Sequence, residues 1–119
     1  MIQAWNCRWR RGITFLMHLT SQPTFIDFFA GCGGLSLGLE QAGFYPLYVN
    51  ELNSDARETY LRNRDKHYPH LREKFSSIDV KQVITEDGYF DNLLSDLSSH
   101  FRRDFTHGGV DLVAGGPPC

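Results

Sequence analysis

A glycine-rich turn and a carboxylate twenty residues beyond it are the features of this sequence best suited to chemistry. Gly31, Gly33 and Gly34 follow an apolar run, and glycines in such a turn let backbone N–H groups face a ligand without side chains in the way. Glu51 lies at the offset from Gly31 at which nucleotide-binding α/β folds carry an acid for ribose hydroxyls. Each feature alone has an equally ready structural explanation: the glycines as a connecting turn, and Glu51 as a helix cap. Their combination favours binding.

Three further residues are candidates at the ends of apolar runs. Asp79 closes a short run at 75–80, where its carboxylate suits an adenine amino group or is simply a surface aspartate. Phe29 is either a stacking platform or part of the core. Cys119 follows two prolines, and a cysteine at the carboxyl end of a strand is a candidate nucleophile, although a lone cysteine is more often inert.

Alternating strand and helix patterns position these residues. Short β-branched and aromatic runs predict buried strands, and apolar residues spaced four and seven apart predict helices. Leu35, Leu39 and Ala42 have the helical spacing, and Glu58 stands where it would complete a capping box with Asp55. The elements predicted in chain order are strand 24–29, helix 35–42, strand 44–50, a helix from Ser54 or Asp55 to about Asn63, strand 75–80, helices 80–84 and 89–101, and strand 110–114.

This alternation predicts an α/β fold with a mostly parallel sheet and helices on its faces. Residues 64–74 are polar and contain Pro69, so they are interpreted as a loop. In such a sheet the strand ends that carry Phe29, Glu51 and Asp79 meet at one edge, which is where open α/β folds bind ligands.

Composition limits the function classes. The chain has 119 residues, a net charge of −2, 41% hydrophobic residues and a mean hydropathy of −0.35, which predict one soluble domain without a membrane span. Residues 25–119 hold nine basic and fourteen acidic residues, net −5, so charge alone does not suggest DNA binding. Three widely spaced cysteines predict a reducing, cytoplasmic location and no structural metal.

Residues 1–23 form a separate N-terminal extension in this interpretation. They carry three arginines before a short apolar run at 13–17, but the run is shorter than a signal peptide needs and no small-residue cleavage site follows it. The extension is expected to be flexible or to reflect a misassigned start, with Met17 as the alternative initiator. The domain proper is residues 24–119.

Four segments, taken in order, closely resemble the first four motifs of the DNA (cytosine-5)-methyltransferases. The segments are Phe25–Leu35, Asn50-Glu51, Ile78–Val80 and Asp111–Cys119. The resemblance covers residues 24–119, and the combination of Phe-Ala-Gly-Cys-Gly-Gly with a final Gly-Gly-Pro-Pro-Cys is highly specific.

This resemblance implies the N-terminal half of a Rossmann-like methyltransferase fold that uses S-adenosyl-L-methionine, with a mostly parallel sheet and flanking helices. Cys119 matches the family's catalytic nucleophile, which adds to C6 of a cytosine flipped out of the duplex before C5 is methylated. Pro118 would help to position the base. The implied cofactor-binding residues are Phe29, Ala30, Gly31, Gly33, Gly34, Leu35, Glu51, Leu52, Asp79 and Val80.

Members of the family continue well beyond this cysteine, so the resemblance implies a fragment. Its partners would be double-stranded DNA, reached through regions missing here, and a complementary C-terminal half, with no membrane and no metal. Methylation would belong to a restriction-modification setting, and the chain alone is expected to be inactive. The alternatives are an inactive residual cofactor-binding fragment and a nicotinamide-dependent oxidoreductase fragment. Ser36, in the place of the last glycine of GxGxxG, disfavours the last of these.

Overall fold

A four-stranded parallel sheet organises residues 22–118, which are the residues that the computed structural model describes. Its strands lie in the order β3-β2-β1-β4, and every pair of neighbours is parallel. This confirms the predicted α/β class. The strands are β1 (Thr24–Phe28), β2 (Tyr45–Asn50), β3 (Ser76–Ser77) and β4 (Leu112–Gly115). The predictions for residues 1–21 and for Cys119 lie outside the described residues, and the domain division at residue 24 stays a prediction.

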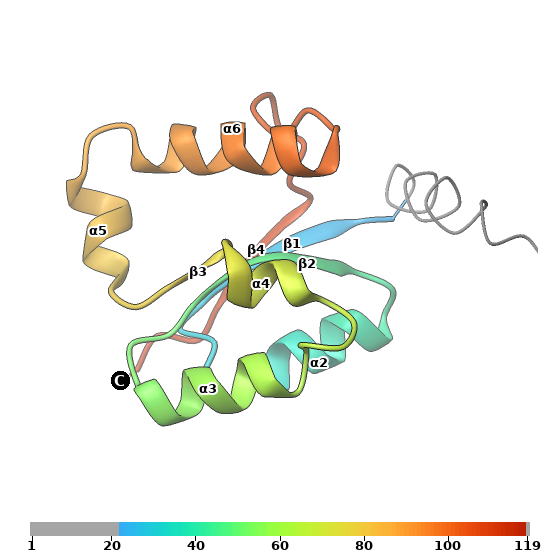
Figure 1. Cartoon of the computed structure of the whole chain (residues 1–119), viewed down its shortest axis with the longest axis vertical. Coiled ribbons are helices and arrows are strands. Elements are labelled where there is room, and N and C mark those ends of the chain that lie inside the picture. Colours follow the sequence, from blue (N-terminus) through green and yellow to red (C-terminus); the bar gives the residue numbers. More distant parts are fainter. Residues whose placement is uncertain (1–21, 119) are drawn as a thin grey trace, which may run out of the picture.

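Five helices of the described chain connect these strands and cover the sheet. Figure 1 shows α6 on one side of the sheet and α2 and α3 on the other. The helix predicted at 89–101 agrees with α6, and that at 80–84 with all but the last residue of α5. The helices are α2 (Gly34–Gln41), α3 (Ser54–Arg62), α4 (Pro69–Glu73), α5 (Val80–Thr85) and α6 (Tyr89–Phe101).

Two apolar clusters hold the layers together. The larger contains the inward face of α6, with Leu93, Leu97 and Phe101, and strand residues such as Ile26 and Leu47. The smaller joins β2 to α3 and α4; it consists of Ala30, Val49, Tyr60, Leu61 and Leu71. Because both sides of the sheet are covered, strand β2 is buried at every position, as is usual for a central parallel strand.

Helix α2 does not use the face that its leucine spacing predicts. Its one fully buried residue is Ser36, whereas on the predicted face Leu35 is 51% exposed, Leu39 is half-buried and Ala42 is exposed. The reason is a polar contact: the Ser36 hydroxyl donates to the carboxylate of Asp27, which lies buried on β1. Leaving a buried carboxylate without a hydrogen-bond partner costs more free energy than leaving a leucine side chain exposed to solvent.

Two other local predictions are wrong. The segment 64–74 is not a plain loop, because it contains α4, with Pro69 at its first position, where proline is favourable. The cap of α3 is Asn53, whose side chain accepts from the amides of Asp55 and Ala56. Glu58 takes no part in a capping box, since its carboxylate pairs with Arg72.

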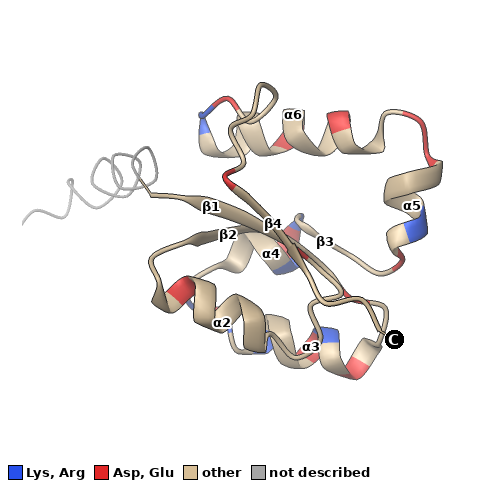
Figure 2. Cartoon of the chain, turned by 180° about the vertical axis from the view of Figure 1, so that it is seen from behind, with Lys and Arg blue, Asp and Glu red and all other residues tan. Residues whose placement is uncertain are grey.

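Charged residues are scattered over the helices, as Figure 2 shows, with acidic and basic positions interspersed. This agrees with the mildly acidic composition of the chain. Within residues 22–118, none of the helices has the length and apolar character that crossing a membrane requires.

Candidate functional site

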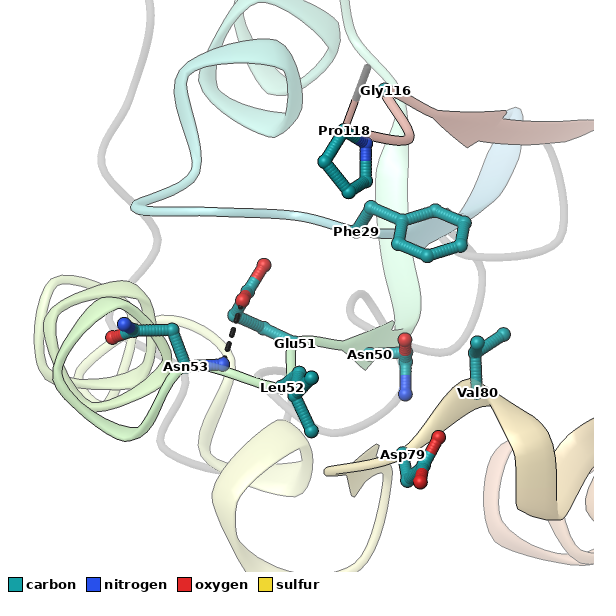
Figure 3. A pocket seen from close by; sticks show the side chains of 9 residues that line it. All are labelled: Phe29, Asn50, Glu51, Leu52, Asn53, Asp79, Val80, Gly116 and Pro118. Atoms are coloured by element: carbon teal, nitrogen blue, oxygen red, sulfur yellow. Dashed lines mark hydrogen bonds between the residues drawn. The ribbon is translucent and has the colours of Figure 1, made fainter.

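A cavity of about 450 Å³ opens at the carboxyl edge of the sheet. Six of the residues predicted for the site line it, and they come from the ends of all four strands and the start of α5 (Figure 3). These residues lie at one edge because parallel strands place their carboxyl ends together. The complete lining is Phe29, Asn50, Glu51, Leu52, Asn53, Asp79, Val80, Gly116 and Pro118.

The glycine turn borders the cavity without lining it. Predicted residues Ala30, Gly31, Gly33, Gly34 and Leu35 are absent from the lining. The turn is anchored to β2 by the Ala30 amide, which donates to the Asn50 carbonyl at 3.0 Å, and is closed by the Gly33 amide, which donates to the Ala30 carbonyl at 3.0 Å. Gly31 and Gly33 have φ of 58° and 97°, the left-handed region in which glycine is least strained.

Phe29 is a cavity residue and not a core residue. The residue is 37% exposed, and its φ of 57° is unusual for a residue other than glycine. This conformation belongs to the sharp turn at which β1 ends. Figure 3 shows the Phe29 ring on one side of the cavity and Asp79 on the other. Non-glycine residues in this backbone region persist only where the surrounding structure holds them.

Glu51 is bound by two backbone amides. Its Oε2 accepts from the Gly31 amide at 2.6 Å and its Oε1 accepts from the Asn53 amide at 2.8 Å, the second of which is drawn in Figure 3. The carboxylate therefore ties the glycine turn to the end of β2. Each carboxylate oxygen has two lone pairs, so both oxygens retain acceptor capacity toward the cavity.

Asp79 and its neighbours form the other side of the cavity. The Oδ1 atom of Asp79 accepts from the Lys81 amide at 2.9 Å and so caps α5. Leu52 is 68% exposed, and with Val80 it supplies apolar surface at the lining. The predicted aspartate thus has a structural role as a cap and also faces the cavity.

Asn50 is a cavity residue that sequence reasoning missed. The residue is 2% exposed and its Nδ2 donates to the Ser77 hydroxyl at 2.9 Å. That hydroxyl also accepts a hydrogen bond from Tyr48. Its position could have indicated a place in the site, because Asn50 is the last residue of β2 and directly precedes Glu51.

A buried polar network beneath the turn was also missed. Asp27 is fully buried; its Oδ2 accepts from Ser36 at 2.6 Å, and the Ser36 and Tyr60 hydroxyls lie 2.8 Å apart. Burial raises the pKa of the Asp27 carboxyl, opposed by the hydrogen bond from Ser36 and the charge of Arg64. Its Oδ1 has no partner among the described residues. The sequence feature that could have indicated this network is an acidic residue inside an apolar strand, because such a residue is rarely buried without a partner.

Two cysteines, Cys32 and Cys119, belong to the segments that border or follow the cavity residues. Cys32 is exposed in the glycine turn and unpaired with another cysteine. Cys119 lies outside the described residues, but Pro118, its neighbour in sequence, lines the cavity. Within residues 22–118, no cluster of three or more histidine, cysteine, aspartate or glutamate side chains could hold a metal ion.

Comparison with known families identifies the domain whose sheet edge forms the cavity. The sequence model described as C-5 cytosine-specific DNA methylase matches residues 23–119. The chain belongs to this family. The glycine turn, the carboxylates at the ends of β2 and β3 and the Gly-Gly-Pro-Pro segment after β4 all lie within the match.

Individual relatives agree with the family assignment. The type II methyltransferase M1.HphI of Haemophilus parahaemolyticus is 36% identical over 97 residues, which cover 81% of this chain and 21% of that protein. M.PspPI of a Psychrobacter species is 37% identical over 98 residues, covering 81% and 17%. DNA (cytosine-5)-methyltransferase 1B of rice, Oryza sativa subsp. japonica, is 30% identical over 105 residues, covering 79% and 7%. The chain spans about a fifth of the length of the two bacterial relatives.

Proposed function

We propose that this chain forms the S-adenosylmethionine-binding part of a DNA cytosine-5 methyltransferase. The observation that carries the proposal is the convergence of Phe29, Glu51, Asp79 and Pro118 on one cavity in a chain of this family. The cavity volume of about 450 Å³ lies within the range of small-molecule sites. Its mixture of apolar walls and a few placed carboxylates also suits a nucleoside-containing ligand.

Each lining group has a part in this proposal. Glu51 would accept from the ribose hydroxyls through the lone pairs that its two backbone amides leave open. Asp79 would accept from the adenine amino group, since only its Oδ1 is engaged in capping. Phe29, Leu52 and Val80 would pack against the apolar faces of the ligand.

The glycine turn would hold the ligand through its backbone. With no side chains at Gly31, Gly33 and Gly34, the amides at the start of α2 can come close to a bound molecule. When bound, the cofactor supplies an electrophilic methyl group. Cys119, as the nucleophile, would bond to C6 of the cytosine, and this bond would break again when the C5 proton leaves. Pro118, in the cavity wall, would position the base next to the methyl group.

Titration calorimetry of the 119-residue chain tests cofactor binding. We expect one molecule of S-adenosylmethionine or S-adenosylhomocysteine to bind per chain, and nicotinamide adenine dinucleotide not to compete with it. Competition by the dinucleotide, without binding of either sulfur compound, would favour the oxidoreductase alternative.

Methyl transfer is tested separately with DNA and a labelled methyl donor. In a protein that contains this chain and transfers the labelled methyl group to DNA, Cys119→Ser should abolish that transfer. The affinity for S-adenosylhomocysteine should stay unchanged, because the thiol bonds to the base and not to the cofactor. The chain alone is expected to be inactive, so the residual-fragment alternative is favoured only if the cofactor binds and DNA stays unlabelled after a complementary C-terminal half has been supplied.

A further inference from the structure

Arg64 is a buried cation with partners from three segments. Its side chain is 5% exposed. Its Nε donates to Glu40 Oε1 at 2.7 Å, its Nη1 to the Tyr60 carbonyl at 3.2 Å and its Nη2 to the Gly33 carbonyl at 3.1 Å. Its guanidinium carbon lies 3.9 Å from the centre of the Tyr60 ring. Buried arginine is tolerated when its donors are satisfied in this way.

The contact with Gly33 joins this cation to the glycine turn. The Gly33 carbonyl accepts from Arg64 and also from the Leu37 amide, at 2.9 Å, in the first turn of α2. A Cβ atom at Gly33 would lie 2.5 Å from Arg64 Nη1 and 2.7 Å from the Tyr60 ring. The guanidinium and the turn are therefore packed so closely that each limits the position of the other.

A second branch of the same network fixes the start of α2. Tyr60, which lies against Arg64, reaches the Ser36 hydroxyl at 2.8 Å, and Ser36 donates to Asp27 on β1. The first turn of the helix is thus tied to the strand beneath it as well as to α3. Hydrogen bonds are directional, so this arrangement sets orientation in a way that apolar packing does not.

The turn is consequently held from two sides. On the cavity side Glu51 accepts from the Gly31 amide at 2.6 Å, and on the core side Arg64 donates to the Gly33 carbonyl. We propose that Arg64 is a positioning residue for the cofactor, holding the turn at the distance from Glu51 that ligand binding requires. This inference rests on the proposed function.

The chain offers a matched control at Arg72. This arginine pairs with two acids, Glu58 and Asp65, both at 2.8 Å, whereas Arg64 pairs with one, Glu40. Its side chain is 38% exposed, and none of its hydrogen bonds involves the glycine turn. Its removal therefore also breaks ion pairs of an arginine, but these pairs are exposed and lie at residues that do not line the cavity.

The experiment uses two variants of Arg64 in the full chain. The double variant Arg64→Met/Glu40→Gln removes the buried charge pair together and keeps much of the side-chain volume, but deletes the donor to Gly33. Arg64→Lys keeps the charge near Glu40, although one ammonium group lacks the guanidinium fork that reaches all three partners. The control is Arg72→Met. Binding of S-adenosylhomocysteine is measured by calorimetry at equal folded fraction, and amide hydrogen exchange is measured without ligand.

We expect the double variant to bind S-adenosylhomocysteine about tenfold more weakly, the scale of one lost hydrogen bond, and Arg64→Lys to fall between it and the wild type. Amide exchange should rise over residues 31–37 without a matching rise in β1 and β2. Arg72→Met should leave both the affinity and this exchange pattern unchanged.

The two proposals fail in different ways. If the wild type binds no S-adenosylhomocysteine, the proposed function is wrong. If the wild type binds and the folded double variant binds equally well, the positioning role of Arg64 is wrong. A rise in exchange spread evenly over the sheet, with wild-type affinity, also overturns it and leaves Arg64 as a stabilising residue alone. Should the double variant not fold, wild-type affinity in Arg64→Lys overturns the inference and a weakened affinity supports it.

Discussion

The two sides of the sheet are built from different interactions. Against α6 the contacts are between aromatic rings. The centre of the Phe101 ring lies 5.8 Å from that of Tyr45, 6.3 Å from that of Phe75 and 6.2 Å from that of Phe105. On the side of α2 and α3, a chain of hydrogen bonds passes from Asp27 through two hydroxyls to the neighbourhood of Arg64. The α6 side is an aromatic cluster, and the other side combines a smaller apolar cluster with a polar network.

This difference separates stability from orientation. Apolar burial is non-directional and scales with the area removed from water, so ring packing in the aromatic cluster stabilises the fold without setting the orientation of the glycine turn. Hydrogen bonds fix angles and distances, and those of the polar network end at the glycine turn. Changes on the α6 side should therefore alter unfolding, whereas changes around the turn should alter binding.

The largest effect should come from the aromatic cluster. Phe101 is 5% exposed, and we expect Phe101→Ala to lower the free energy of unfolding by about 3–5 kcal/mol, the usual cost of removing a buried phenylalanine ring. Urea denaturation measures this loss, and ligand affinity at equal folded fraction should be unchanged. Ile84→Ala, at a residue that is 76% exposed, is the control. A loss no larger than that of the control would contradict the division between the two sides.

A pH effect should arise within the same cluster. Burial lowers the pKa of His70 from its ordinary value of 6.5 to about 4, although its Nε2 lies 2.9 Å from the Pro46 carbonyl. Below pH 6.5 the unfolded chain binds a proton that the folded chain resists, so stability is lost as the pH falls from 6.5 toward 4. The full shift corresponds to about 3 kcal/mol.

Denaturation curves at several pH values check this expectation. His70→Gln should flatten the loss of stability in that pH window, whereas His107→Gln, at a side chain that is 87% exposed, should not. An equal slope in the wild type and His70→Gln would show that another group controls the acid sensitivity.

On the cavity side, Glu51→Ala should weaken S-adenosylmethionine binding by about 1–3 kcal/mol, the range for losing hydrogen bonds to a charged group. The variant loses the acceptor for ribose and also the acceptor for the Gly31 and Asn53 amides. Calorimetry gives the affinity, and a thermal melt separates binding from folding. Unchanged affinity would remove Glu51 from the site.

The smallest effect should come from the ion pairs on the outside of α3 and α4. Arg72 makes close contacts with Glu58 and Asp65, which lower the pKa of both carboxyls through hydrogen bonds from Arg72. These groups are solvent-exposed, so the pairs are screened and contribute little. Arg72→Ala should barely move the melting midpoint, and less still at high salt. A marked loss would show that exposed pairs matter as much as the buried network.

The sequence by itself determined the order of the described strands and helices except for α4, and it determined that the strand ends meet at one edge of the sheet. Strands with apolar runs and the helix at Tyr89–Phe101 are specified by local pattern. Once the sheet is parallel, the ends of β1, β2 and β3 must lie together, so Phe29, Glu51 and Asp79 could be predicted as neighbours without coordinates.

Only the tertiary structure decided how the glycine turn is held. Arg64 stands in a polar stretch that indicates a loop, and Ser36 stands on a helix whose leucines indicate a different buried face. Both are buried because Asp27, nine residues from Ser36, and the Gly33 carbonyl, 31 residues from Arg64, lie beside them in the fold. Local periodicity describes how a segment meets apolar surface. It contains no information about which buried polar group will need a partner, because that need arises only when separate segments have packed together.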